Sequence, residues 1–212
     1  QPITRGASNL TAALEVRAAM HYPGAIQHIL ICDRSDLESQ IICQAWIARH
    51  PASTVALLFV DSASGSIATK IEKLEVGLKH AIGEVLCFID DDISPRSDTL
   101  ALLVRYLETP GAGATFGVAC YTNWNTHAAS LMSAFVNANA LTSYLPLTYV
   151  AEPYTITGHI FALRRKVFAD IGGLTGMDQR IDGDHELARR VRAHGLHFVQ
   201  TPALYDVDNR LA

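Results

Sequence analysis

Three times within its first 107 residues, the chain passes from a short apolar run into a segment with helical spacing of apolar side chains. Strands that alternate with helices in this way form a mainly parallel sheet with helices against its faces. We therefore predict an α/β fold, doubly wound and in a single domain. The predicted strands cover residues 28–32, 54–60 and 85–89, and the predicted helices cover residues 10–20, 36–50, 70–82 and 97–107.

The second half of the chain is less regular, so fewer elements can be predicted there. Apolar runs favour strands, and one amphipathic segment that ends at Gly195 favours a helix. The predicted strands cover residues 113–121, 160–163 and 196–201, and the predicted helix covers residues 184–194.

Acidic residues follow directly after each of the three apolar runs in the first half: Asp33, Asp61, and the triplet Asp90, Asp91 and Asp92. One aspartate after a strand is weak evidence of function, because aspartate is common there as a turn former or helix cap. Parallel strands, however, present their carboxyl ends at one edge of the sheet, where such folds bind ligands. Three acidic strand ends at one edge therefore predict a binding pocket.

The triplet points to a metal ion. Carboxylates that gather at one place repel one another unless a cation lies among them. Asp90 and Asp92 therefore predict a divalent metal, Mg²⁺ or Mn²⁺, and a phosphate-bearing substrate. Lys70 begins the helix before this strand and could reach the same pocket, although a solvated helix residue is an equal alternative. The chain has no glycine-rich P-loop and no G-x-G-x-x-G after its first strand.

A second group of polar residues lies further along the chain, at Thr157, Gly158 and His159 and then at Asp182 and Asp184. Asp184 begins a predicted helix, where unpaired backbone N–H groups favour an ionised carboxylate. Such a carboxylate can act as a general base toward a hydroxyl group. The alternative is that Asp182 or Asp184 only caps the helix.

Composition narrows the class of protein. The net charge is −4 and 49% of the residues are apolar, which argues against disorder and against nucleic-acid binding. The four cysteines lie in apolar runs without C-x-x-C spacing, so we expect reduced thiols. Residues 128–150 lean apolar, but Asn137, Asn139 and Pro146 argue against a membrane-spanning helix. This segment is either an ordinary buried helix or one that lies against a membrane surface.

The order of these motifs resembles a known family. Pro2, Asn9 and Leu10 come first, then Asp33, Lys70 and the aspartate triplet, the T-G-x-x-x-x-L-R-R block from Thr157 to Arg165, Gly172-Gly173-Leu174, and Asp184. The series resembles the GT-A glycosyltransferases of family 21, the ceramide glucosyltransferase type, and related bacterial hopanoid-associated enzymes within the broader family 2 clan. The resemblance covers nearly the whole chain.

The resemblance implies an inverting transfer of a hexose from a UDP-sugar to a lipid hydroxyl at the cytosolic face of a membrane. It implies that the sugar nucleotide is bound by a set of residues in the first half, with Asp92 and Asp90 on the metal. It places the acceptor near Thr157, Gly158 and His159, with Asp184, or Asp182, as the base. The nucleotide-sugar set is Pro2, Asp33, Asp61, Lys70, Asp90 and Asp91.

The same resemblance divides the domain into a nucleotide-sugar-binding half, residues 1–107, and an acceptor-binding half, residues 108–212. It also implies a final Arg-Trp motif and C-terminal membrane helices beyond Asp208, whereas the sequence ends at Ala212. We therefore expect a fragment of a membrane-anchored protein. Two alternatives remain: a sugar nucleotidyltransferase, and a truncated domain that binds the donor without turnover.

Overall fold

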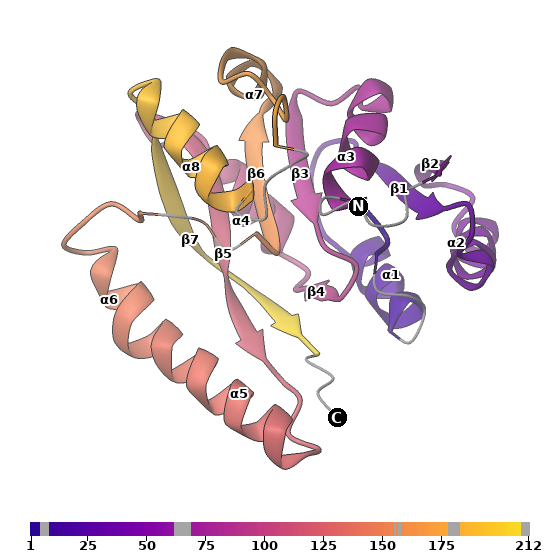
Figure 1. The fold of residues 1–212 in the computed structure, drawn as a ribbon, viewed down its shortest axis with the longest axis horizontal. Coiled ribbons are helices and arrows are strands. Elements are labelled where there is room, and N and C mark those ends of the chain that lie inside the picture. The colour runs from indigo at the N-terminus through magenta and orange to yellow at the C-terminus, as the bar shows by residue number, and fades with distance from the viewer. Residues whose placement is uncertain (5–8, 62–68, 155, 157, 178–182, 209–212) are drawn as a thin grey trace.

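The strands of the molecule form two sheets, seen together in Figure 1. The computed structural model describes residues 1–4, 9–61, 69–154, 156, 158–177 and 183–208. The smaller sheet pairs β1 (Gln27–Asp33) with β2 (Thr54–Val60) in parallel. The larger sheet has the order β3-β6-β5-β7-β4, with β3 (Val85–Ile89), β6 (Ile160–Arg164), β5 (Ala112–Tyr121), β7 (His197–Val207) and β4 (Ile93–Pro95).

Most strands of the larger sheet share one direction. β5 and β7 are parallel, and β3 has the same direction because both β3 and β5 pair antiparallel with β6. β4 is a short antiparallel edge strand beside β7. The carboxyl ends of β3, β5 and β7 therefore lie at one edge of this sheet.

Helices cover both sheets. They are α1 (Leu10–Ala18), α2 (Leu37–Arg49), α3 (Thr69–His80), α4 (Thr99–Tyr106), α5 (His127–Asn139), the π-helical turn η1 (Ala140–Tyr144), α6 (Leu145–Leu147), α7 (Arg165–Asp170) and α8 (Gly183–Ala193). Apolar side chains of α3, α7 and α8 pack with β3, β5 and β6 in one core cluster, and α4 packs in a second cluster on β4, β5 and β7. α1 and α2 enclose a third cluster against β1 that is centred on the buried Trp46.

The strands and helices predicted for residues 1–107 are all present, and three features were missed. β4 has only three residues, and α7 follows β6 without a loop. β7 continues through Pro202 to Val207, beyond the predicted end at residue 201. A shift of register between β5 and β7, from Phe116 opposite Gln200 to Val118 opposite Leu204, accommodates the proline, since proline in a sheet needs such an irregularity.

The predicted division into two halves cuts across the larger sheet. β3 and β4 belong to residues 1–107, but they pair with β6 and β7 from the second half. Assignment of the donor to one half and the acceptor to the other stays a prediction.

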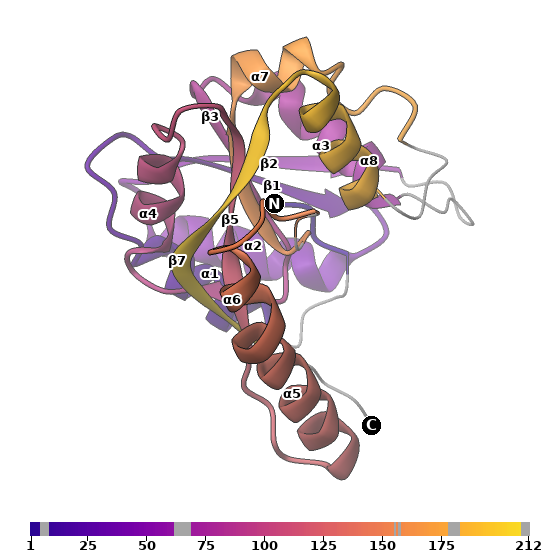
Figure 2. The same ribbon diagram turned by 90° about the vertical axis from the view of Figure 1, so that its left-hand side faces the viewer.

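The interpretation of residues 128–150 as an ordinary buried helix is wrong. α5, η1 and α6 form one helical arm that projects from the body of the molecule, as Figure 2 shows. Leu131 is 74% exposed and Phe135 is 65% exposed. None of the helices in the described part of the chain has the length and apolar content needed to cross a membrane.

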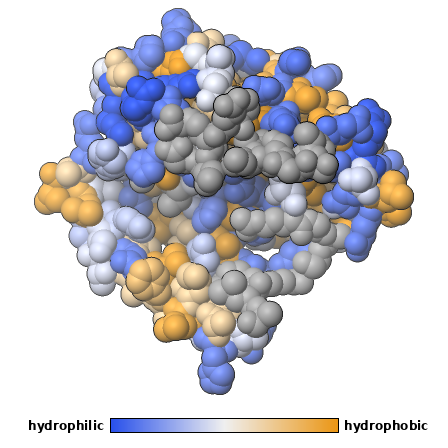
Figure 3. All heavy atoms as spheres, in the orientation of Figure 1, coloured by the Kyte–Doolittle hydropathy of each residue, from blue (hydrophilic) through white to orange (hydrophobic). Residues whose placement is uncertain are grey.

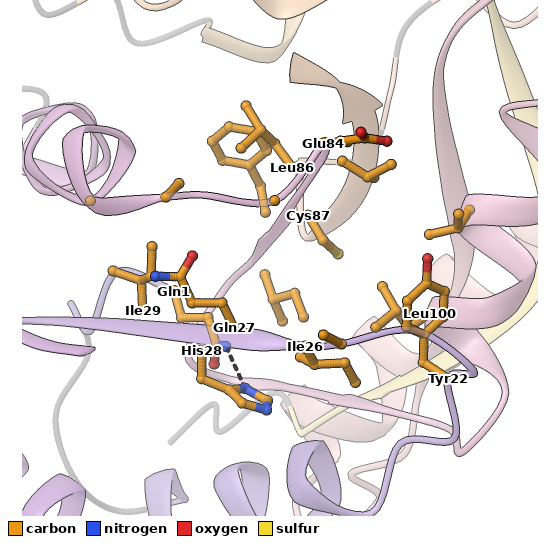
Figure 4. Close-up of a pocket in the computed structure, with 18 of the residues that line it drawn as sticks. Gln1, Tyr22, Ile26, Gln27, His28, Ile29, Glu84, Leu86, Cys87 and Leu100 are labelled. Atoms are coloured by element: carbon orange, nitrogen blue, oxygen red, sulfur yellow. Dashed lines mark hydrogen bonds between the residues drawn. The ribbon is translucent and has the colours of Figure 1, made fainter. Parts of the chain in front are cut away.

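A cavity of about 350 Å³ lies between β1 and β3, which face each other without pairing (Figure 4). Gln27, His28 and Ile29 line one side, and Leu86 and Cys87 line the other. The segment that begins at Gln1 closes one end, where backbone hydrogen bonds join Ile31 to Gln1 and Ile3. This cavity runs along the two strands as far as Ile89, the last residue of β3, and the acidic residues at the carboxyl ends of the strands are not part of its lining.

Candidate active site

The aspartate triplet forms the turn between β3 and β4, and the backbone fixes its position. The N–H of Asp90 donates to the carbonyl oxygen of His159 at 2.9 Å. This hydrogen bond continues the β3–β6 pairing by one step, because Ile89 already lies opposite Ile160. Asp90 and His159, predicted to serve the donor and the acceptor respectively, therefore lie side by side.

Lys70 reaches the aspartate triplet and is not simply a solvated helix residue, which was its alternative interpretation. Its Nζ lies 2.6 Å from Oδ1 of Asp90, whose side chain is only 18% exposed. It also donates to the carbonyl oxygen of Gly158 at 3.4 Å. Burial raises the pKa of Asp90, and the Lys70 ammonium and His159 oppose that shift. A buried carboxylate beside a cation is a typical arrangement for a functional pocket.

Asp91 and Asp92 have different surroundings. Asp91 is 5% exposed, and its Oδ2 accepts a hydrogen bond of 2.6 Å from the backbone N–H of Thr4. It therefore links the turn to the N-terminal segment, and its role in nucleotide binding stays a prediction. Asp92 is partly exposed, and its charge acts together with that of Asp90 on His159. Asp90 and Asp92 thus lie near one imidazole ring, as expected of a shared site.

Sequence reasoning missed Arg17, a fully buried guanidinium beneath the triplet. It donates to the carbonyl oxygens of Asp90 and Ile93, which bracket the turn, and to Oε1 of Gln1. Burial lowers the pKa of Arg17 to about 10, and the three aspartates oppose that shift. Its position gave a signal: with Leu10 and Leu14 it lies on the apolar face of the first helix.

Lys73 is a second residue that the sequence analysis missed. It lies one turn after Lys70 in α3 and is 4% exposed. Its Nζ donates to the carbonyl oxygen of Ile3 at 2.6 Å and lies 3.9 Å from Oδ2 of Asp33. Helical spacing of three residues puts both lysines on one side of α3, which the sequence could have revealed. The first turn of α3 thereby contacts two of the acidic strand ends.

The other residues predicted to bind the nucleotide sugar lie on or directly beside the strands of the smaller sheet. Asp33 ends β1, and its Oδ1 accepts from Oγ of Ser35 at 2.9 Å. Pro2 forms a parallel bridge with Ile31 in the middle of β1. Asp61 follows β2 with a side chain that is 78% exposed and pairs with Nε of Arg34 at 3.2 Å. Nucleotide binding by Pro2, Asp33 and Asp61 stays a prediction.

Gly158 and His159 lie in the turn before β6, next to the first turn of α8. A Cβ atom added to Gly158 would overlap with the carboxylate of Asp184, so the turn and the aspartate are in close contact. Asp184 also acts electrostatically on His159, whose pKa is lowered by burial. Nδ1 of His159 lies 3.4 Å from the hydroxyl oxygen of the buried Tyr205. Tyr205 is another residue that the sequence analysis missed. Thr157 and Asp182 fall outside the described residues.

The carboxylates of the triplet are suited to a metal ion whose remaining ligands come from a substrate. Among the described residues, no three His, Cys, Asp or Glu side chains converge into a preformed metal cage. Mg²⁺, and the similarly hard Mn²⁺, commonly takes one or two protein carboxylates and completes its shell with phosphate oxygens and water. Asp90 and Asp92 fit that pattern, and Lys70 adds a cation at the same place.

Comparison with known proteins gives a consistent picture. The sequence profile described as Glycosyl transferase family 21 matches residues 1–208. A search of curated proteins found no match.

Solved structures share the fold at low sequence identity. A mannosyltransferase from Pyrobaculum calidifontis in complex with GDP-Man and Mn²⁺ is 19% identical, with a TM-score of 0.71 over 96% of this chain and 54% of its own. GalNAc-T7 with UDP, GalNAc and Mn²⁺ is 13% identical, with a TM-score of 0.69 over 99% of this chain and 42% of its own. TarS from S. aureus is 13% identical, with a TM-score of 0.67 over 98% of this chain and 36% of its own. The chain therefore has the predicted GT-A fold and spans about half or less of each of these structures.

Proposed function

The chain belongs to glycosyl transferase family 21, and on that premise we propose that it carries the donor site and the base of an inverting hexosyltransferase. The donor is a UDP-sugar and the acceptor is a lipid hydroxyl at the cytosolic face of a membrane. The observation that carries the proposal is the largely buried Asp90 carboxylate, 2.6 Å from Lys70 and next to Asp92 in the chain, at the carboxyl end of β3. Solved structures of this fold with a nucleotide sugar or UDP and Mn²⁺ support it.

On the donor side, Asp92 and Asp90 would hold Mg²⁺ or Mn²⁺, and the ammonium group of Lys70 would bind a phosphate oxygen of the donor. When bound, the metal neutralises charge on the diphosphate of the leaving UDP. Arg17 keeps the turn in place from beneath, because it binds the carbonyl oxygens at both ends of the triplet. The pocket thus holds the anionic part of the donor between fixed positive and negative groups.

On the acceptor side, Asp184 takes the proton of the attacking hydroxyl. The acceptor oxygen forms a bond to the anomeric carbon as the bond from that carbon to the UDP oxygen breaks, and the bond electrons leave with UDP. Attack from the side opposite to the leaving group inverts the anomeric configuration. The close contact between Asp184 and Gly158 supports a base that faces the turn beside Asp90.

Calorimetric titration of UDP in the presence of Mn²⁺ tests the donor half. The Asp92→Asn variant should lose metal-dependent UDP binding, whereas Asp98→Asn, a change at the exposed aspartate directly before α4, should bind as the wild type does. Equal UDP affinity in the wild type with Mn²⁺ and with EDTA would show that the metal assignment is wrong.

The Asp184→Asn variant tests the base. Removal of a general base lowers a rate by about 10²- to 10⁴-fold, so UDP release in the presence of a lipid acceptor should fall by that factor while UDP binding persists. Loss of UDP binding together with the rate would mean that Asp184 serves the fold and not the reaction. Release of pyrophosphate from a nucleoside triphosphate would instead identify a nucleotidyltransferase.

A further inference from the structure

The helical arm of α5, η1 and α6 inverts the usual arrangement of a surface helix. Such a helix normally turns its large apolar side chains toward the core. Here the buried side chains are small, Ala129, Ser133 and Ala140, each less than 10% exposed. The exposed apolar side chains of the arm are Leu131, Met132, Phe135, Leu141, Tyr144 and Leu147.

Polar contacts hold the arm to the body, so its exposure is not a result of loose attachment. Asn137 donates to the carbonyl oxygen and accepts from the N–H of Tyr121, both at 2.9 Å, at the end of β5. Ser133 donates to the carbonyl oxygen of Asn123 at 2.7 Å, and the Thr126 hydroxyl caps the first turn of α5. These bonds fix which face of the arm looks outward.

The exposed face is continuous and carries no formal charge. Residues 109–151 contain no Asp, Glu, Lys or Arg. Trp124, 54% exposed, precedes α5, and Tyr149, 90% exposed, follows α6. In Figure 3, apolar surface gathers over the lower left part of the molecule, where Figure 1 places the arm.

This chemistry fits a lipid interface better than a protein partner. Aromatic side chains at the ends of an apolar helical face are typical of segments that lie at the boundary of headgroups and acyl chains. Protein interfaces usually surround their apolar centre with a polar rim that includes charged groups. Over residues 128–148 the polar groups of the arm are Asn, Ser and Thr side chains and the Tyr144 hydroxyl, all of them uncharged, so its partner need not carry a net charge.

The arm also lies next to the candidate site. Tyr121, to which the arm is hydrogen-bonded, lies beside His159 of the site, with 6.4 Å between the two ring centroids. Beyond its far end, the guanidinium of Arg192 lies over the ring of Tyr154, 4.5 Å from its centroid, which joins this end to α8 and thus to the helix that carries Asp184. A lipid held on the arm would therefore have its headgroup close to the acceptor side of the pocket.

We propose that the exposed face of α5, η1 and α6 lies in the interfacial layer of a lipid bilayer and binds it through apolar and aromatic contacts without requiring anionic lipid. The proposal deepens the proposed function, since it gives the surface through which a lipid acceptor reaches Asp184. It also stands on the arm alone and can be tested separately from catalysis.

Tryptophan fluorescence offers a direct test. The chain has two tryptophans: Trp46 is fully buried, and Trp124 is half exposed at the start of the arm. Vesicles of pure phosphatidylcholine should shift the emission to the blue, and brominated phosphatidylcholine should quench it. Salt should leave binding unchanged because no surface charge is involved. No spectral change with vesicles, or binding only to anionic vesicles at low salt, would overturn the proposal.

Matched variants locate the surface. The double substitution Leu131→Gln and Phe135→Gln should lower the partition coefficient into phosphatidylcholine vesicles about tenfold or more, because two large apolar side chains no longer enter the lipid. Ile82→Gln removes an apolar side chain that is 78% exposed outside the arm and should leave partitioning unchanged. Equal losses in both variants would overturn the proposal.

Two further measurements distinguish a failure of the membrane proposal from a failure of the proposed function. Sedimentation equilibrium without lipid should show a monomer, whereas a dimer that the arm substitutions dissociate would show that this face binds a second copy. Mn²⁺-dependent UDP binding should be the same in wild type and arm variants. Vesicle binding without UDP binding would contradict the proposed function alone, and UDP binding without vesicle binding would contradict this inference alone.

Discussion

At the scale of single residues, the candidate site is a group of oppositely charged side chains that are partly buried. Asp90 lies between Lys70 on its carboxylate and Arg17 on its carbonyl oxygen. Three aspartates face two fixed cations, which leaves an excess of negative charge that a divalent ion can neutralise. This arrangement is what the proposed donor, a nucleotide sugar with a divalent cation, would require.

Lys70→Met should weaken UDP binding in the presence of Mn²⁺ by about tenfold. The substitution removes a cation from the proposed phosphate-binding site and leaves the Asp90 carboxylate without its ammonium partner, a loss of roughly 1.4 kcal/mol. Calorimetric titration measures the effect. Lys79→Met, at the exposed far end of α3, is the matched control, and an equal effect in both variants would contradict the role of Lys70.

His28 should make the protein sensitive to acid. Burial and the charge of Arg17 lower the pKa of His28 to about 4, against an ordinary value of 6.5. Between these pH values the unfolded chain binds a proton at His28 and the native protein does not. The free energy of unfolding is therefore complete above pH 6.5 and falls by about 3 kcal/mol as the pH decreases to 4.

Urea denaturation at a series of pH values checks this expectation. His28→Gln keeps an acceptor for Nε2 of Gln1 but cannot be protonated, so its free energy of unfolding should fall less between pH 6.5 and 4.5. His80→Gln, an exposed change, should follow the wild type. Parallel pH profiles for wild type and His28→Gln would refute the assignment.

At the scale of elements, periodicity predicted most strands and helices, because apolar side chains that repeat at two or 3.6 residues must face a core. Periodicity failed where contacts between elements distant in sequence determine the structure. β4 exists through its pairing with β7, and the outward face of α5 resembles in sequence the inward face of a core helix. Sequence also placed Lys70 near the triplet, but Arg17 and Lys73 act through backbone carbonyl oxygens that no motif contains.

Gly158→Ala should separate the turn before β6 from the first turn of α8. The added methyl group would overlap with the Asp184 carboxylate, so one of the two must move. Displacement of a reacting group by about 1 Å can lower a rate by roughly 10²-fold. We expect UDP release with a lipid acceptor to fall steeply while Mn²⁺-dependent UDP binding changes little.

Gly176→Ala is the control for stability. Gly176 has a positive φ of 72° but open space around it, so alanine there should lower the free energy of unfolding by about 1 kcal/mol without disturbing Asp184. If the loss of activity in both glycine variants follows their loss of unfolding free energy, the close contact between Gly158 and Asp184 plays no part in catalysis.

At the scale of the whole molecule, the candidate site joins parts of the chain that are distant in sequence. Its side chains come from the ends of β1 and β3, the first turns of α3 and α8, and the turn before β6, from Asp33 to Asp184. A ligand that spans these side chains would contact elements of both sheets. Binding should therefore stabilise the fold as a unit and not only one loop.

UDP with Mn²⁺ should raise the melting temperature by about 5 to 10 °C when the free ligand is at 100 times its dissociation constant. Under that condition a ligand that binds only the native state adds about 2.7 kcal/mol, and each kcal/mol shifts a domain of this size by about 2 to 4 °C. Differential scanning fluorimetry measures the shift. UDP with EDTA, and UDP with Mn²⁺ on the Asp92→Asn variant, should give little change. A full shift in EDTA would mean that the pocket binds UDP without a metal, and no shift under any condition would mean that the acidic edge does not bind the nucleotide.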